Sequence, residues 1–221
     1  MTAALCVDPG AVISGPKVLG LDLSLTATGI AGPGWAETVK TRAQRTREQQ
    51  VDFVHSRMDG LLDRIDAYLA GVDLAVIENL ARRPGFDMTR QMAAFNWMVR
   101  RLLWKRGIPY ALMDTTQLKV YAVGKGRRNG KRSGEAEQES AKSGTMQAVH
   151  AWFPWFTGDD NAADALVLMC AGRDWLGHPL VQLPEENRRV LRRVQWPTMP
   201  VLPGIAQQLA SLDILAKGNA A

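Results

Sequence analysis

Short apolar runs bounded by polar residues mark the strands of this chain. The runs Lys17–Leu23 and Asp73–Glu78 predict buried strands, and each contains a carboxylate at or next to its end. Small and hydroxyl residues over Ser24–Gly29 predict a tight hairpin, and residues 30–39 supply one or two more short strands. Residues 108–113 form a further apolar run. We therefore expect a sheet of short, mostly buried strands.

Between these strands, apolar residues recur with the spacing of amphipathic helices. It covers residues 51–69, before Gly71, and residues 88–106, before Gly107. Thr115 is placed to cap a short helix that runs through Val120, and further helices are expected at about 142–153 and 160–173. Strands that alternate with helices predict an α/β fold whose helices pack on the faces of the sheet.

Two stretches break this alternation. Residues 124–144 are rich in Gly, Lys, Arg, Ser and Glu and poor in apolar groups, which predicts a loop. Beyond Trp175 the chain becomes Pro-rich, as expected for an extension that wraps the domain or reaches a partner. The predicted organisation is an N-terminal extension (1–16), one α/β domain (17–173) and a C-terminal extension (174–221).

Composition and charge narrow the class of protein. The chain has 221 residues, 27 Lys and Arg against 22 Asp and Glu, and only Cys6 and Cys170. Ten cations lie between Arg100 and Arg132 against one acid, Asp114, so a polyanionic partner is favoured. Without a long apolar run, a signal-peptide pattern or a cysteine framework, we expect a cytoplasmic protein with no membrane partner.

Four acidic residues are the candidate chemistry. Asp22 and Glu78 end two predicted strands, so neighbouring positions in one sheet would bring their carboxylates together. Asp160 and Asp164 stand one helical turn apart and present two more oxygens. Gathered carboxylates repel one another unless cations bind them, and hard oxygen ligands favour Mg²⁺, with Mn²⁺ as a substitute.

These segments resemble a known family. Val18-Leu-Gly-Leu-Asp22-Leu-Ser-Leu-Thr-Ala-Thr-Gly29, Val76-Ile-Glu78-Asn and Asn161-Ala-Ala-Asp164 are similar, in order and placement, to the three acidic motifs of RuvC-type Holliday junction resolvases. The segments that hold Lys119 and Lys142 resemble the family's lysine-bearing segments. The resemblance covers about residues 17–173, and the chain's size and cationic loop are similar to those of phage-type members, which would act in the host cytoplasm.

The resemblance implies an RNase H-like fold, with a central mixed five-stranded sheet, and a homodimer that cuts four-way DNA junctions. It implies two Mg²⁺ ions per site, no nucleotide cofactor, and Asp22, Glu78, Asp160 and Asp164 as catalytic metal ligands. Cations near the site would contact phosphates. They are Lys119, Lys142, Arg82 and Arg83, together with Lys125, Arg127, Arg128, Lys131 and Arg132 of the loop.

Three positions depart from the family pattern. The residue three before Asp164 is Asn161, where many members have an acid or a histidine, so either Asn161 or Asp160 is the fourth ligand; we favour the charged oxygen of Asp160. Asp8 is followed by residues closer to the usual first motif, but Asp22 has strands on both flanks. Phe86 is the nearest aromatic to the place of the family's wedge.

Other interpretations remain. An actin-like ATPase or sugar kinase fragment would share a strand-end Asp followed by hydroxyl residues, and a non-catalytic nucleic-acid-binding protein would share the charge. The segment Gly126–Ser133 departs from a phosphate-binding loop in its glycine spacing and lacks a preceding strand. Trp97 and Trp104, seven residues apart, favour core packing or a dimer interface over base stacking.

Overall fold

A five-stranded mixed sheet forms the centre of the molecule, for which a computed structural model describes residues 13–41, 50–80, 87–124 and 135–198. Its order is β3-β2-β1-β4-β5. β1, β4 and β5 are parallel, and β2 is antiparallel to both of its neighbours, as the expected mixed sheet requires. The strands are β1 (Val18–Asp22), β2 (Ala27–Gly32), β3 (Trp35–Lys40), β4 (Leu74–Asn79) and β5 (Tyr110–Asp114).

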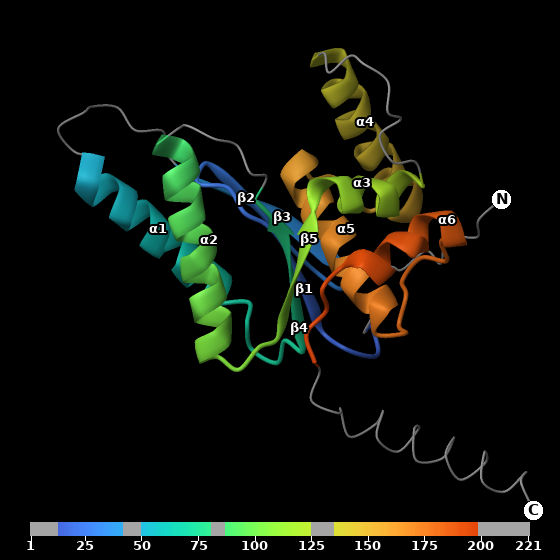
Figure 1. Cartoon of the computed structure of the whole chain (residues 1–221), viewed down its shortest axis with the longest axis horizontal. Helices are drawn as coiled ribbons and strands as arrows, with labels where there is room; N and C mark the ends of the chain where they lie inside the picture. Colours follow the sequence, from blue (N-terminus) through green and yellow to red (C-terminus); the bar gives the residue numbers. More distant parts are fainter. Residues whose placement is uncertain (1–12, 42–49, 81–86, 125–134, 199–221) are drawn as a thin grey trace, which may run out of the picture.

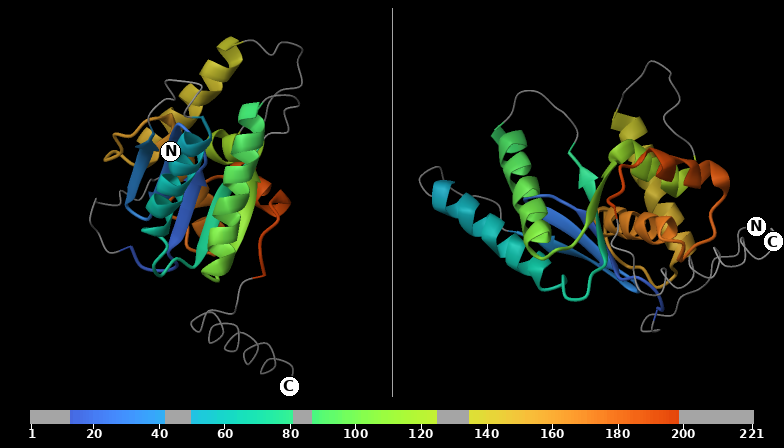
Figure 2. Two further views of the ribbon diagram at one scale, coloured as in Figure 1. Left: turned by 90° about the vertical axis from the view of Figure 1, so that its left-hand side faces the viewer. Right: turned by 60° about the horizontal axis from the view of Figure 1, so that its bottom comes forward.

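Helices cover both faces of the sheet. α1 (Gln50–Asp66) and α2 (Asp87–Lys105) lie on one side, and α3 (Thr115–Val123), α4 (Glu135–Trp152) and α5 (Asp160–Trp175) lie on the other (Figures 1 and 2). Leu19 and Leu21 of β1 are buried in the core on the α1 and α2 side, and Val18 is buried on the α5 side. This two-sided burial explains why β1 is a continuous apolar run rather than an alternating one.

Two glycines let α5 pack directly on the sheet. A Cβ at Gly20 of β1 would stand 1.9 Å from the carbonyl oxygen of Ala165, and a Cβ at Gly29 of β2 would stand 2.0 Å from that of Asn161. Any side chain at either position would push the helix away. These glycines therefore set the depth at which the first turns of α5 meet β1 and β2.

Two local predictions were wrong. α4 begins at Glu135, so its first part falls within the stretch predicted as a loop, 124–144; residues 125–134 lie outside the described part of the chain. The cap of α3 is Asp114 rather than Thr115, which is the first helical residue, and α3 continues to Val123 rather than Val120. No helix in the described segments is long and apolar enough to cross a membrane.

The chain after α5 packs back onto the α5 side of the domain. α6 (Glu185–Arg188) and a 3₁₀ helix, η1 (Arg189–Arg193), lie beside α3 (Figure 1), and Val190 and Leu191 join the core. Arg188 forms an ion pair of 2.7 Å with the buried carboxylate of Asp174. Gln195 then forms an antiparallel bridge to Leu112 of the edge strand β5. Residues 176–195 thus complete one side of the core.

Candidate active site

Asp22 and Glu78 lie side by side where two parallel strands end. Leu21 of β1 pairs with Ile77 of β4, so the next residue of each strand is one of the two acids. Asp22 is buried at 9% exposure, and Glu78 is half-buried. The sheet register therefore produces the juxtaposition that the strand-end pattern predicted.

The N-terminus of α5 brings two more carboxylates to the same place. Asp159 is the N-cap, and its side chain accepts a hydrogen bond from the backbone N–H of Ala162 at 3.3 Å. It also accepts one from Thr38 and pairs with Lys40 at 3.2 Å. Although burial raises the pKa of Asp159, these partners bring that pKa below its ordinary value. The cap thus fixes the first helical turn, which carries Asp160, and the next turn carries Asp164.

Electrostatics confirm that these acids affect one another. Burial is the largest cause that raises the pKa of Asp22, to about 10; a hydrogen bond with Glu78 and repulsion from Glu78, Asp164 and Asp160 add to it. A carboxyl group surrounded by three others in a dehydrated position resists ionisation. A bound cation would therefore favour the ionised form of Asp22.

A small hollow of about 120 Å³ opens beside the acids. Asp160, Asp164 and Lys119 line it, so the structure brings three of the predicted site residues together. Sequence reasoning missed two further lining residues, Thr115 at the start of α3 and the buried Thr145 of α4. A lone threonine in a helix carries no sequence signal, and only the packing of α3 and α4 against α5 reveals them.

The donor set fits a hard divalent cation. Within the described residues, no three His, Cys, Asp or Glu side chains already converge on one point as a preformed metal site. The other three carboxylates are nevertheless close enough to Asp22 to interact with it, and all four offer only oxygen atoms as ligands. Their repulsion helps to raise the pKa of Asp22, and a bound cation would lower that pKa. Oxygen ligands alone suit a hard divalent cation, whereas zinc favours sulfur and nitrogen ligands.

Several predicted site residues lie outside the described residues. These are Arg82, Arg83 and the loop cations Lys125, Arg127, Arg128, Lys131 and Arg132, together with Asp8 and Phe86. Lys142 falls within α4, but its side chain is not described. The contact of Asn161 with Gly29 is made by its backbone carbonyl and not by its side chain. The choice between Asn161 and Asp160 as the fourth ligand therefore stays a prediction.

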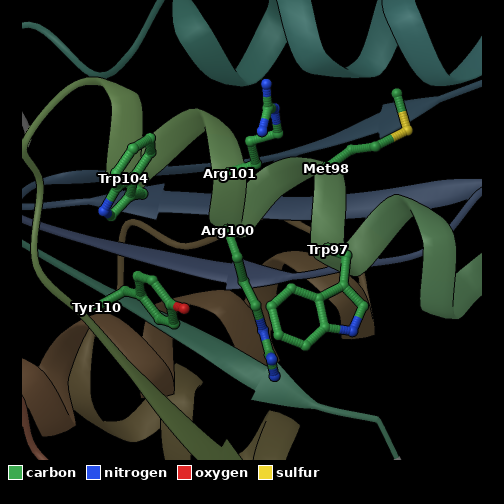
Figure 3. A pocket seen from close by; sticks show the side chains of 6 residues that line it. All are labelled: Trp97, Met98, Arg100, Arg101, Trp104 and Tyr110. Atoms are coloured by element: carbon green, nitrogen blue, oxygen red, sulfur yellow. The ribbon is translucent and has the colours of Figure 1, made fainter.

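A second hollow, of about 440 Å³, lies on the outer face of α2. Trp97 and Trp104 are 64% and 73% exposed. Of the two interpretations that their spacing favoured, core packing is therefore wrong, and a dimer interface stays a prediction. Figure 3 shows Arg100 between Trp97 and Tyr110, with its guanidinium 4.7 Å from the centroid of the Trp97 ring. This face combines large aromatic rings with positive charge.

Comparison with solved structures gives several similarities. Thermus thermophilus RuvC in complex with a Holliday junction substrate aligns with a TM-score of 0.50 and 17% identity, over 76% of this chain and 100% of that chain. The yeast mitochondrial Holliday junction resolvase Ydc2 aligns with a TM-score of 0.41 and 14% identity, over 83% of this chain and 86% of that one. No protein-family model and no curated protein matches the sequence. The chain has the RNase H-like fold that its acidic motifs implied.

Proposed function

We propose that this chain is a metal-dependent, structure-selective endonuclease that cleaves branched DNA, with four-way junctions as its substrate. The observation that carries the proposal is the group of four carboxylates from β1, β4 and α5, in which Asp22 is buried and repelled by the other three. The similarity in fold to a RuvC solved with a Holliday junction substrate supports the choice of substrate.

Each acid has a place in this proposal. Asp22, Glu78, Asp160 and Asp164 would hold two Mg²⁺ ions, and Mn²⁺ would replace them. Bound in this way, the ions supply an activated water and stabilise the leaving oxygen of an in-line displacement. Lys119, which lines the hollow with Asp160 and Asp164, would neutralise the phosphate that enters it. No protein nucleophile is required.

A cleavage assay tests the proposal. The protein is incubated with four-way, forked and linear DNA of one sequence, with and without Mg²⁺, and the cuts are mapped. We expect Mg²⁺-dependent cuts near the branch point only, and we expect Asp22→Asn to abolish cleavage while junction binding is kept. Equal cutting of linear duplex, or turnover in the Asp22→Asn variant, would refute the assignment; in the second case Asp8 is the next residue to test.

Symmetric cutting of a four-way junction requires two active sites, so we further propose a homodimer formed through α2. Its exposed Trp97 and Trp104 are the largest apolar side chains left uncovered in the described residues. α2 carries Arg101 among other cations, and the adjoining α1 carries exposed Asp59 and Asp63. A two-fold arrangement can therefore set the cations of one copy against the acids of the other.

Light scattering after gel filtration tests this interface. We expect the wild type to be a dimer at micromolar concentration and the Trp97→Ala/Trp104→Ala variant to be a monomer that remains folded. Val123→Ala is the matched control, because Val123 is an exposed apolar residue on α3 at 39% exposure. A monomeric wild type, or a double variant that stays dimeric, would exclude α2 as the interface.

A further inference from the structure

Thr115 makes a contact with a candidate metal ligand that the acidic motifs do not include. Glu78 pairs with Met113 across β4 and β5, and Thr115 follows two residues later, just beyond the end of β5, as the first residue of α3. Its hydroxyl donates a hydrogen bond to Oε1 of Glu78. The Glu78 carboxylate is therefore held by Thr115 on one side while it also hydrogen-bonds to Asp22.

The backbone that carries Thr115 is fixed by bonds that do not involve its side chain. The backbone N–H of Asp114 donates to Oε1 of Gln117 at 2.8 Å, and Asn79 Nδ2 donates to Oδ1 of Asp114 at 2.8 Å. Gln117 Nε2 in turn donates to the carbonyl oxygen of Arg193 at 3.3 Å. Loss of the Thr115 hydroxyl would thus leave the first turn of α3 in place.

The contact belongs to the site and not to the core. Thr115 lines the same hollow as Asp160 and Asp164, and both Thr115 and Glu78 are only partly buried. Glu78 lies beside Asp22, with which it interacts strongly. Rotation of the Glu78 side chain out of the site would have to break the hydrogen bond between Oε1 and the Thr115 hydroxyl.

We propose that Thr115 is a positioning residue that orients the Glu78 carboxylate for divalent-cation binding, an inference that rests on the proposed nuclease function. Partners that hydrogen-bond a metal ligand fix its orientation, and their removal costs about tenfold to a hundredfold in metal affinity or activity. The Thr115 hydroxyl fulfils that role for Glu78.

Three variants separate positioning from a structural role. Thr115→Val keeps the shape and removes the hydroxyl, Thr115→Ser keeps the hydroxyl, and Thr116→Val makes the same change at the exposed neighbouring residue. For each variant we would measure Mn²⁺ affinity by calorimetry, junction affinity in EDTA, the single-turnover cleavage rate and the thermal unfolding midpoint.

We expect Thr115→Val to weaken Mn²⁺ binding and slow single-turnover cleavage by about tenfold or more, with unchanged junction affinity and unfolding midpoint. Thr115→Ser should recover most of both losses, and Thr116→Val should match the wild type. Wild-type Mn²⁺ affinity in Thr115→Val, or equal losses in the Val and Ser variants, would overturn the inference. A wild type that binds Mn²⁺ but cuts no branched DNA would instead overturn the proposed function, and the calorimetry would still decide the role of Thr115.

Discussion

The carbonyl oxygen of Asn161 lies 2.0 Å from the point where a Cβ on Gly29 would stand. Gly29 pairs with Asp22 across β1 and β2, so the first turn of α5 is seated against the residue opposite the buried acid. The position of Asp160 and Asp164 relative to Asp22 therefore depends on the absence of a side chain at residue 29.

Gly29→Ala tests this dependence. The added methyl group would meet backbone rather than a flexible side chain, so α5 must shift; overpacking of this kind costs about 1–3 kcal/mol of unfolding free energy. We expect a loss of at least about 2 kcal/mol by urea denaturation, together with loss of cleavage. Gly60→Ala in α1 is the control: nothing lies within 4 Å of the added atom, and the helix should gain stability. Equal stabilities of the two variants would contradict this account.

The raised pKa of Asp22 predicts how stability depends on pH in EDTA. Since this pKa is about 10 in the folded protein against an ordinary value of 3.8, the native state binds more protons than the unfolded state between these limits. The contribution of Asp22 to stability is therefore full below pH 4 and is lost as pH rises through that window, by up to about 1.4 kcal/mol per pH unit. We expect Asp22→Asn to flatten the fall of unfolding free energy with pH, measured by urea denaturation. Parallel pH curves for the two proteins would show that Asp22 ionises without cost.

Two substitutions decide the fourth ligand. Asp160 lines the hollow beside the acids, and the contact of Asn161 with Gly29 is made by its backbone carbonyl. Removal of a hydrogen-bond partner of a metal ligand costs roughly tenfold to hundredfold in activity, and removal of the ligand itself should cost more. We therefore expect Asp160→Asn to reduce the single-turnover rate by more than this amount. Asn161→Ala should have a smaller effect. The reverse order would assign the ligand to Asn161.

The predicted basic loop can be tested by the salt dependence of binding. Lys125, Arg127, Arg128, Lys131 and Arg132 offer five cations within eight residues. If about four of them meet phosphates, log affinity should fall against log salt with a slope of about −3.6. Replacement of all five by Ala should flatten this slope for every branched substrate. Arg189→Ala/Arg193→Ala, which removes exposed cations of η1, is the control; an unchanged slope in the five-Ala variant would place the DNA path elsewhere.

The strand-end acids were predictable because the signal is local. A carboxylate that ends a buried apolar run needs a partner, and parallel strands bring their ends to one edge; Asp22 and Glu78 followed from these two facts. The helical spacing before Gly71 and before Gly107 likewise located α1 and α2 to within a few residues.

The remaining features depend on contacts between distant segments. The sequence pattern placed Gly20 and Gly29 in the first acidic motif but gave no sign of their packing role, because that role is set by the approach of α5 from more than a hundred residues away. Thr115 and Thr145 reach the hollow only after α3 and α4 have packed. The Pro-rich composition after Trp175 predicted an extension. It did not indicate that apolar side chains of this segment, among them Val190, are buried in the core.

The bridge between Gln195 and Leu112 has a consequence for solubility. β5 is an edge strand, and an uncovered edge offers its backbone groups to the sheet of another molecule. A protein shortened to end at Trp175 would lose both this cover and Arg188, the cation that pairs with buried Asp174. Such a truncation is expected to yield insoluble aggregates rather than a minimal folded domain, and any shortened form of the protein should therefore extend beyond Gln195.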